Sequence, residues 1–124
     1  MIQLKRAYEK PSPEDGFRVL VERYWPRDLD KKHAKLDLWL KEVAPSTELR
    51  KQFTRSPVPA RWQEFQTLYW TQLEAKHKII ELLEQKSKEG NLTLVYVGHD
   101  ENHTGAAALK RFLEEAGKTR QFGS

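Results

Sequence analysis

The 124-residue sequence contains no cysteine. This absence excludes disulfide bonds, thiolate catalysis and zinc sites with cysteine ligands, and it is compatible with a reducing compartment. Long apolar runs are also missing, since no stretch approaches the roughly 20 residues that a membrane-spanning helix requires. Residues 1–6 already carry charges and are not followed by the apolar region of a signal peptide. We therefore expect a cytoplasmic protein with no membrane contact.

The motifs of several common enzyme classes are also absent. The sequence has no Gly-x-Ser-x-Gly elbow, no glycine-rich phosphate loop ending in Lys-Ser/Thr and no dinucleotide fingerprint. Its length fits a single domain that can bury one core without metal or disulfide support. We place this domain at residues 1–117 and interpret residues 118–124 as a basic C-terminal tail.

Positive charge is concentrated in one part of the chain. The formal net charge is +4, yet residues 17–61 contain 11 Lys and Arg against 6 Asp and Glu. A basic segment of this kind attracts phosphates, nucleic acid or anionic metabolites. In the alternative interpretation, the lysines of this segment only form the solvent-exposed face of a helix. They are Lys31, Lys32, Lys35 and Lys41.

Three strands and several helices are predicted from periodicity and capping signals. The strands cover residues 2–8, 17–24 and 92–98, and the second contains an uninterrupted apolar run typical of a strand covered on both faces. A helical turn at residues 12–16 separates the first two strands, which pair either in parallel or as an antiparallel hairpin.

The helices lie mainly between the second and third strands. A short helix capped by Asp28 or Asp30 carries apolar residues up to Val43 and ends before Pro45. A second helix begins at Ser46, a long one runs from residue 56 to residue 90, and a closing helix covers residues 104–115. This order predicts an α/β fold, with a small, mainly parallel three-stranded sheet covered by helices in a single three-layer domain.

Polar and aromatic residues follow the predicted second and third strands. Pro26 marks the end of the second strand, because proline cannot donate a hydrogen bond to a ladder. If the two strands are parallel, their carboxyl ends share the edge of the sheet at which α/β proteins bind ligands. We predict a functional rim there, formed by Arg6 or Tyr8, Arg23, Trp25, Arg27, Asp100 and His103.

The leading hypothesis is that this rim binds a phosphorylated small molecule or a nucleotide. Arg23 and Arg27 would make bidentate contacts with the anion, and Trp25 would stack on the ligand or form a wall. In a small enzyme of this kind, His103 would act as acid or base together with Asp100. We expect no cofactor. The alternative is a non-catalytic nucleic-acid-binding or regulatory module that uses the basic surface of residues 17–61.

Two other chemistries are considered at this rim. His99 and His103 are four residues apart, but they do not form the His-Glu-x-x-His motif and they follow a strand end, so we predict no metal site. Asn102 or Asp100 is instead expected to cap the last helix, whose first N–H groups could receive an anion. Paired carboxylates stay an open alternative, drawn from Glu22, Asp28, Asp100 and Glu101.

Several segments together also carry a resemblance to a known family. They are residues 15–27, 44–53, 61–62, 94–96 and 100–103, and in this order they resemble the YeaO-like family of small bacterial proteins of unknown function. Longer proteins grouped with that family show a similar strand ending in arginine, tryptophan and proline, and a histidine that His103 matches. The resemblance implies that the first two strands are parallel. Those relatives often have cysteine beside the histidine, where this chain has Asn102, so no cysteine-dependent reaction is implied.

Overall fold

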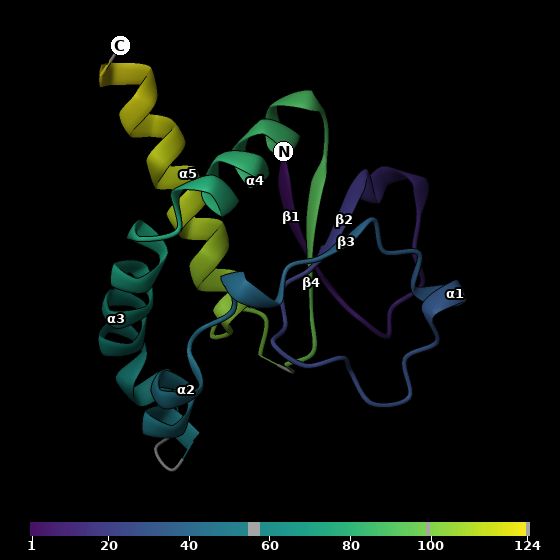
Figure 1. Ribbon diagram of the computed structural model, residues 1–124, viewed down its shortest axis with the longest axis horizontal. Coiled ribbons are helices and arrows are strands. Elements are labelled where there is room, and N and C mark those ends of the chain that lie inside the picture. The colour runs from purple at the N-terminus through teal and green to yellow at the C-terminus, as the bar shows by residue number, and fades with distance from the viewer. Residues whose placement is uncertain (55–57, 99, 124) are drawn as a thin grey trace.

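The computed structural model describes residues 1–54, 58–98 and 100–123. Its centre is a parallel sheet of four strands, β1 (Ile2–Arg6), β2 (Phe17–Leu20), β3 (Leu38–Trp39) and β4 (Leu92–Tyr96), in the order β1-β4-β2-β3 (Figure 1). The predicted α/β fold with a parallel sheet is thus confirmed, with four strands instead of three. Strands β1 and β2 run in the same direction but do not pair, because β4 lies between them.

The additional strand, β3, replaces part of a predicted helix. Helix α1 (Lys31–Ala34) is capped by Asp30, whose carboxylate accepts a hydrogen bond from the Lys32 N–H at 3.0 Å, but it ends at Lys35 in a left-handed conformation. The chain then extends, and Leu38 and Trp39 pair with the edge of β2. A 3₁₀ turn at Lys41–Val43 follows before the chain reaches the next helix. The predicted helix through residues 36–43 is therefore wrong, because pairing with an open strand edge outweighed local helical spacing.

The remaining helices follow the predicted order with different bounds. Helix α2 (Thr47–Thr54) begins after Ser46, whose Oγ accepts a hydrogen bond from the Leu49 N–H at 3.1 Å, as expected for a cap. The single long helix is wrong: a 3₁₀ turn (Val58–Arg61) leads into α3 (Trp62–Glu74), and α4 (His77–Glu89) follows a break. One straight helix over both would extend about 40 Å, too far for α4 to pack against β4. Residues 56 and 57 lie outside the described residues.

Helix α5 (Gly105–Gly123) closes the fold and continues past its predicted end at residue 115. It packs against β1 and β4, as α4 does against β4, and α3 lies outside them (Figure 1). Within the described residues, no helix combines the length and the apolar character needed to cross a membrane.

The two faces of the sheet are covered differently. On one face, helices bury a core that includes Tyr69, Leu83 and Leu109. On the other face, Leu20 and Val95 pack against side chains from the segment between β2 and β3. This segment contains α1 (Figure 1). The third layer of the domain is therefore an irregular segment with one helical turn.

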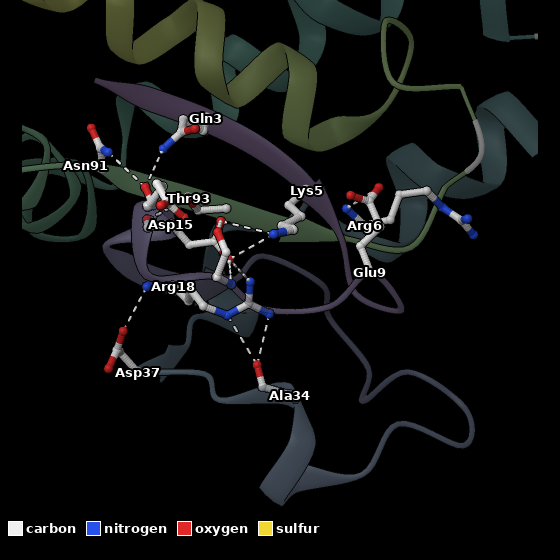
Figure 2. Close-up of polar contacts among 12 residues, drawn as sticks. Gln3, Lys5, Arg6, Glu9, Asp15, Arg18, Ala34, Asp37, Asn91 and Thr93 are labelled. Carbon is white, nitrogen blue, oxygen red and sulfur yellow. Dashed lines mark hydrogen bonds and ion pairs between the residues drawn. The ribbon is translucent and has the colours of Figure 1, made fainter.

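A buried ionic network holds the connection between β1 and β2. Asp15 ends the predicted turn, which is a 3₁₀ turn (Pro13–Asp15), and its carboxylate accepts hydrogen bonds from Arg18 Nη1 at 2.7 Å and Lys5 Nζ at 3.1 Å (Figure 2). Arg18 is only 3% exposed and also donates two hydrogen bonds to the Ala34 carbonyl. These contacts join the turn, β2 and α1, so the charges serve the fold.

Candidate functional site

The residues that follow β2 and β4 line one pocket of about 820 Å³. Its lining residues come from the carboxyl edge of the sheet, from α2 and from the start of α5. Much of its wall is apolar and includes Val21, Pro26, Pro45, Phe53, Phe65 and Ala106. The two strand ends therefore converge, as the parallel topology requires.

Two oppositely charged side chains line this pocket. Glu22 follows β2, and its Oε2 accepts a hydrogen bond from the Val97 N–H at 3.0 Å. Burial raises the pKa of the Glu22 carboxyl, while the hydrogen bond from Val97 and the charge of Arg50 act in the opposite direction. Arg50 is an exposed residue of α2, and its guanidinium has no hydrogen bond or ion pair within the described part of the chain. The pocket thus contains a carboxylate with one hydrogen bond from the described residues and a cation with none, and the two interact through their charges.

His103 also lines the pocket, and Asp100 orients its imidazole. His103 Nδ1 lies 2.7 Å from Asp100 Oδ2, and this contact holds the pKa of the Asp100 carboxyl below its ordinary value. The ring is packed edge-on against the Trp62 indole, with their centroids 5.2 Å apart. Asp100 itself is exposed and does not line the pocket. The two residues predicted as a catalytic pair are therefore in contact, with only the histidine facing the ligand space.

The start of α5 forms another part of the pocket wall. Its cap is Thr104, whose Oγ1 accepts a hydrogen bond from the Ala107 N–H at 3.1 Å, so the predicted cap at Asn102 or Asp100 is wrong. Asp100 instead closes a local turn by accepting from the Asn102 N–H. Gly105 and Ala106 line the pocket at the helix end where backbone N–H groups lack intrahelical acceptors. These N–H groups favour a negative charge in the adjacent space.

Three residues predicted to bind the ligand instead donate side-chain hydrogen bonds to backbone carbonyls. Arg23 donates to the Ala44 carbonyl at 3.1 Å and to the Pro45 carbonyl at 3.3 Å. Arg6 Nε donates to the Gly98 carbonyl at 3.1 Å. The Tyr8 hydroxyl donates to the Arg27 carbonyl at 2.7 Å. These side chains brace the loops around the pocket and do not line it.

The other two predicted ligand-binding residues have different positions. Trp25 lines the pocket and its indole N–H donates to the Leu29 carbonyl at 2.9 Å, so the ring is held in place. Arg27 is exposed and lies outside the pocket lining.

The basic residues of segment 17–61 are distributed over several elements, among them α2 and the irregular segment that covers the sheet. Its lysines are exposed, with Lys31 and Lys32 in α1 and Lys35 at its end. Lys31 Nζ lies 5.7 Å from the Trp25 ring centroid, and Lys41 Nζ lies 5.7 Å from that of Trp39. Because two of the cations already cover the tryptophan faces, these rings are poorly placed to stack on nucleic-acid bases.

Sequence reasoning did not assign Tyr24 or Arg50 to the rim, and it considered Glu22 only as one of several carboxylates. All three line the pocket. Glu22 and Tyr24 lie in the segment singled out from the sequence. Arg50 carried no comparable signal, because nothing local in the sequence places α2 beside the ends of β2 and β4.

The described residues include no cluster of three or more metal-ligating side chains. His99, one of the two histidines considered for a metal site, lies outside the described residues. The groups that the described residues offer to a ligand include the guanidinium, carboxylate, imidazole and backbone N–H groups named above and the Tyr24 ring.

Comparisons with known proteins agree with the sequence resemblance. The family model described as "Inactive DUF488-N3 subclade" matches residues 1–124. The uncharacterized protein YeaO of Escherichia coli (strain K12) is 37% identical over 112 residues, which cover 90% of this chain and 96% of YeaO. The uncharacterized proteins Mb3100c of Mycobacterium bovis and Rv3073c of Mycobacterium tuberculosis are each 38% identical over 81 residues, covering 65% of this chain and 67% of theirs. No solved structure is significantly similar to the chain.

Proposed function

Because this chain belongs to the inactive DUF488-N3 subclade, we propose that it is a non-catalytic protein that binds a small anionic ligand in the pocket at the carboxyl edge of the sheet. The description of the subclade as inactive supports binding over turnover. The pocket lining supports it too: the chain has no cysteine, the described residues place no serine in the lining, and the threonine that they place there, Thr104, already caps α5.

The observation that carries this proposal is the position of Arg50. Its guanidinium makes no hydrogen bond or ion pair within the described residues, although its charge acts on Glu22, and it lines the same pocket as the start of α5. A guanidinium can bind a carboxylate or phosphate through two parallel hydrogen bonds. The N-terminal end of a helix adds N–H donors and a partial positive charge. Both groups favour an anion in the part of the pocket between α2 and α5.

Arg50 and Arg27 form a matched pair for testing this proposal. Both are exposed arginines, but only Arg50 lines the pocket. We expect inorganic phosphate to raise the melting temperature of the unmodified protein. Arg50→Ala should weaken phosphate binding about tenfold or more, since a hydrogen bond to a charged group contributes about 1.5 to 3 kcal/mol. Isothermal titration calorimetry would measure the loss.

Arg27→Ala should bind phosphate as the unmodified protein does, and Lys32→Ala provides a second exposed control. Equal losses in all three variants would contradict the pocket as the site. Such losses, combined with steep salt dependence and a preference for long single-stranded RNA over phosphate, would instead support the basic surface of residues 17–61 as a nucleic-acid interface.

A further inference from the structure

We infer that the ligand of this pocket is a nucleotide, whose base donates hydrogen bonds to Glu22 while its phosphate lies between Arg50 and the start of α5. This inference rests on the proposed function, because it assigns a chemical class to the ligand of the same pocket. It is carried by three side chains that line the pocket and lack a complete set of protein partners in the described part of the chain, namely Glu22, Tyr24 and Arg50.

Glu22 offers one carboxylate oxygen to a hydrogen-bond donor from a ligand. Its Oε2 accepts from the Val97 N–H, but its Oε1 has no partner within the described residues, and no salt bridge neutralises the carboxylate there. An ionised carboxylate can accept hydrogen bonds at both of its oxygens, so Oε1 is available to a donor from a ligand. A ligand that carried only an anionic group would add repulsion at Glu22. The amino and ring N–H groups of a nucleobase would supply donors instead.

Tyr24 offers a surface for a planar ring. It follows Arg23 in the loop after β2, its side chain is 65% exposed, and it makes no ring contact or hydrogen bond within the described part of the structure. Exposed aromatic rings of this kind stack on bases. The buried rings of Phe53 and Phe65 line the same pocket and pack edge to face against each other. A flat, largely apolar heterocycle fits such a lining.

The size of the pocket agrees with a mononucleotide. Its volume of about 820 Å³ lies in the range of pockets that enclose small organic ligands. Inorganic phosphate would occupy a small part of that space and would leave Tyr24 and the Oε1 atom of Glu22 unused. A ligand that joins a base to a phosphate can reach the carboxylate and the guanidinium together.

The test compares nucleotides with a sugar phosphate that lacks the base. Calorimetric titration would use the 5′-monophosphates of adenosine, cytidine and guanosine, with ribose 5-phosphate as the base-free ligand. We expect at least one of these nucleotides to bind about tenfold or more tightly than ribose 5-phosphate, because the base adds a hydrogen bond to a charged group. Glu22→Gln should reduce this advantage, with the stacking on Tyr24 retained, and leave the affinity for ribose 5-phosphate equal or higher. Glu42→Gln, at an exposed carboxylate outside the pocket lining, should change neither.

A second variant keeps the test decisive if Glu22→Gln fails to fold. Tyr24→Ala alters an exposed side chain, and we expect it to weaken nucleotide binding while ribose 5-phosphate binding is unchanged. If ribose 5-phosphate binds through Arg50 but no nucleotide binds more tightly, the nucleotide inference is wrong and the proposed function stands. If neither phosphate, ribose 5-phosphate nor nucleotides bind, both are overturned.

Discussion

Three arginines of this protein have three different roles, which depend on the acceptors that each one meets. Arg18 is buried and donates to Asp15 and Ala34, so it serves the fold. Arg23 holds two backbone carbonyls of the loop before α2. Arg50 lines the pocket with its guanidinium unpaired in the described residues. The residue type alone therefore indicates a possible anion site, and the available partners decide whether one exists.

Asp15→Asn should destabilise the protein strongly. The substitution leaves Arg18, which is 3% exposed, without its carboxylate and removes the partner of Lys5. Breaking a buried ion pair from one side costs roughly 3 to 5 kcal/mol, and urea denaturation at pH 7 would measure the change in the free energy of unfolding. Asp30→Asn is the matched control: it removes an exposed partner of His33, and we expect little change in the free energy of unfolding.

Asp15→Asn should also alter the pH dependence of stability. Burial acts to raise the pKa of Asp15, but hydrogen bonds from Ser12, Lys5 and Arg18 outweigh it and lower the pKa below its ordinary value. Because the folded-state pKa is below the unfolded one, the stabilisation is present above about pH 4 and is lost as the pH falls through the folded value. Between pH 6 and pH 2, the free energy of unfolding should fall less steeply with falling pH for Asp15→Asn than for the unmodified protein. Equal slopes would show that Asp15 does not carry this dependence.

At the scale of elements, contacts between distant segments override local periodicity. The apolar residues of segment 36–40 have helical spacing, yet Leu38 and Trp39 extend along the edge of β2. The apolar stripe of residues 62–83 continues through a break between α3 and α4, because α4 must turn back to pack against β4 and α5. Gly16 shows a similar constraint at a single position, since it joins the 3₁₀ turn to β2 with a φ of +64°.

Gly16→Ala should be severely destabilising. A Cβ at this position would overlap the backbone carbonyl of Asn91, and the left-handed conformation is itself unfavourable for alanine. We expect a loss of more than about 2 kcal/mol, the order of the strain at a disallowed backbone position. Thermal unfolding followed by circular dichroism would measure it. Gly90→Ala is the control: Gly90 has an extended backbone, and a Cβ added there would have no neighbouring atom within 4 Å. An equally large loss there would contradict the steric explanation.

At the scale of the whole molecule, the sheet joins the two ends of the described chain. Strand β4, from the last third of the sequence, lies between β1 and β2 and pairs with both. Neither the amino-terminal nor the carboxyl-terminal half can therefore complete the sheet alone. Since α4 and α5 pack on the same sheet, unfolding one part removes the partner of the other.

We accordingly expect a single cooperative unfolding transition. Trp25 and Trp39 report on the side of the sheet covered by the irregular segment, and Trp62 and Trp70 report on the side covered by helices. Tryptophan fluorescence therefore follows both sides, while far-ultraviolet circular dichroism follows the helices. The two signals should change at the same urea concentration, as required for two-state unfolding. Two separated midpoints would contradict a single domain over residues 1–117.

The sequence by itself determined the features that depend on neighbouring residues. These include the central strands, the turn that starts after Ser12, the caps at Asp30 and Ser46, and the α/β class. Such features follow from side-chain periodicity and local hydrogen bonds, which are independent of the rest of the chain. The meeting of the β2 and β4 ends at one edge of the sheet also followed, because parallel strands place their carboxyl ends on one edge. Of the residues predicted for the rim, Trp25 and His103 line the pocket there.

Only the tertiary structure decided how each polar side chain is used. Strand β3 depends on the open edge of β2, and the backbone acceptors of Arg6 and Arg23 come from residues far away in the sequence. The pocket unites Glu22 and Arg50 because α2 packs beside the strand ends. Hydrogen bonds and charge interactions act over a few ångströms, so their partners are set by the packing of distant segments and cannot be read from local sequence.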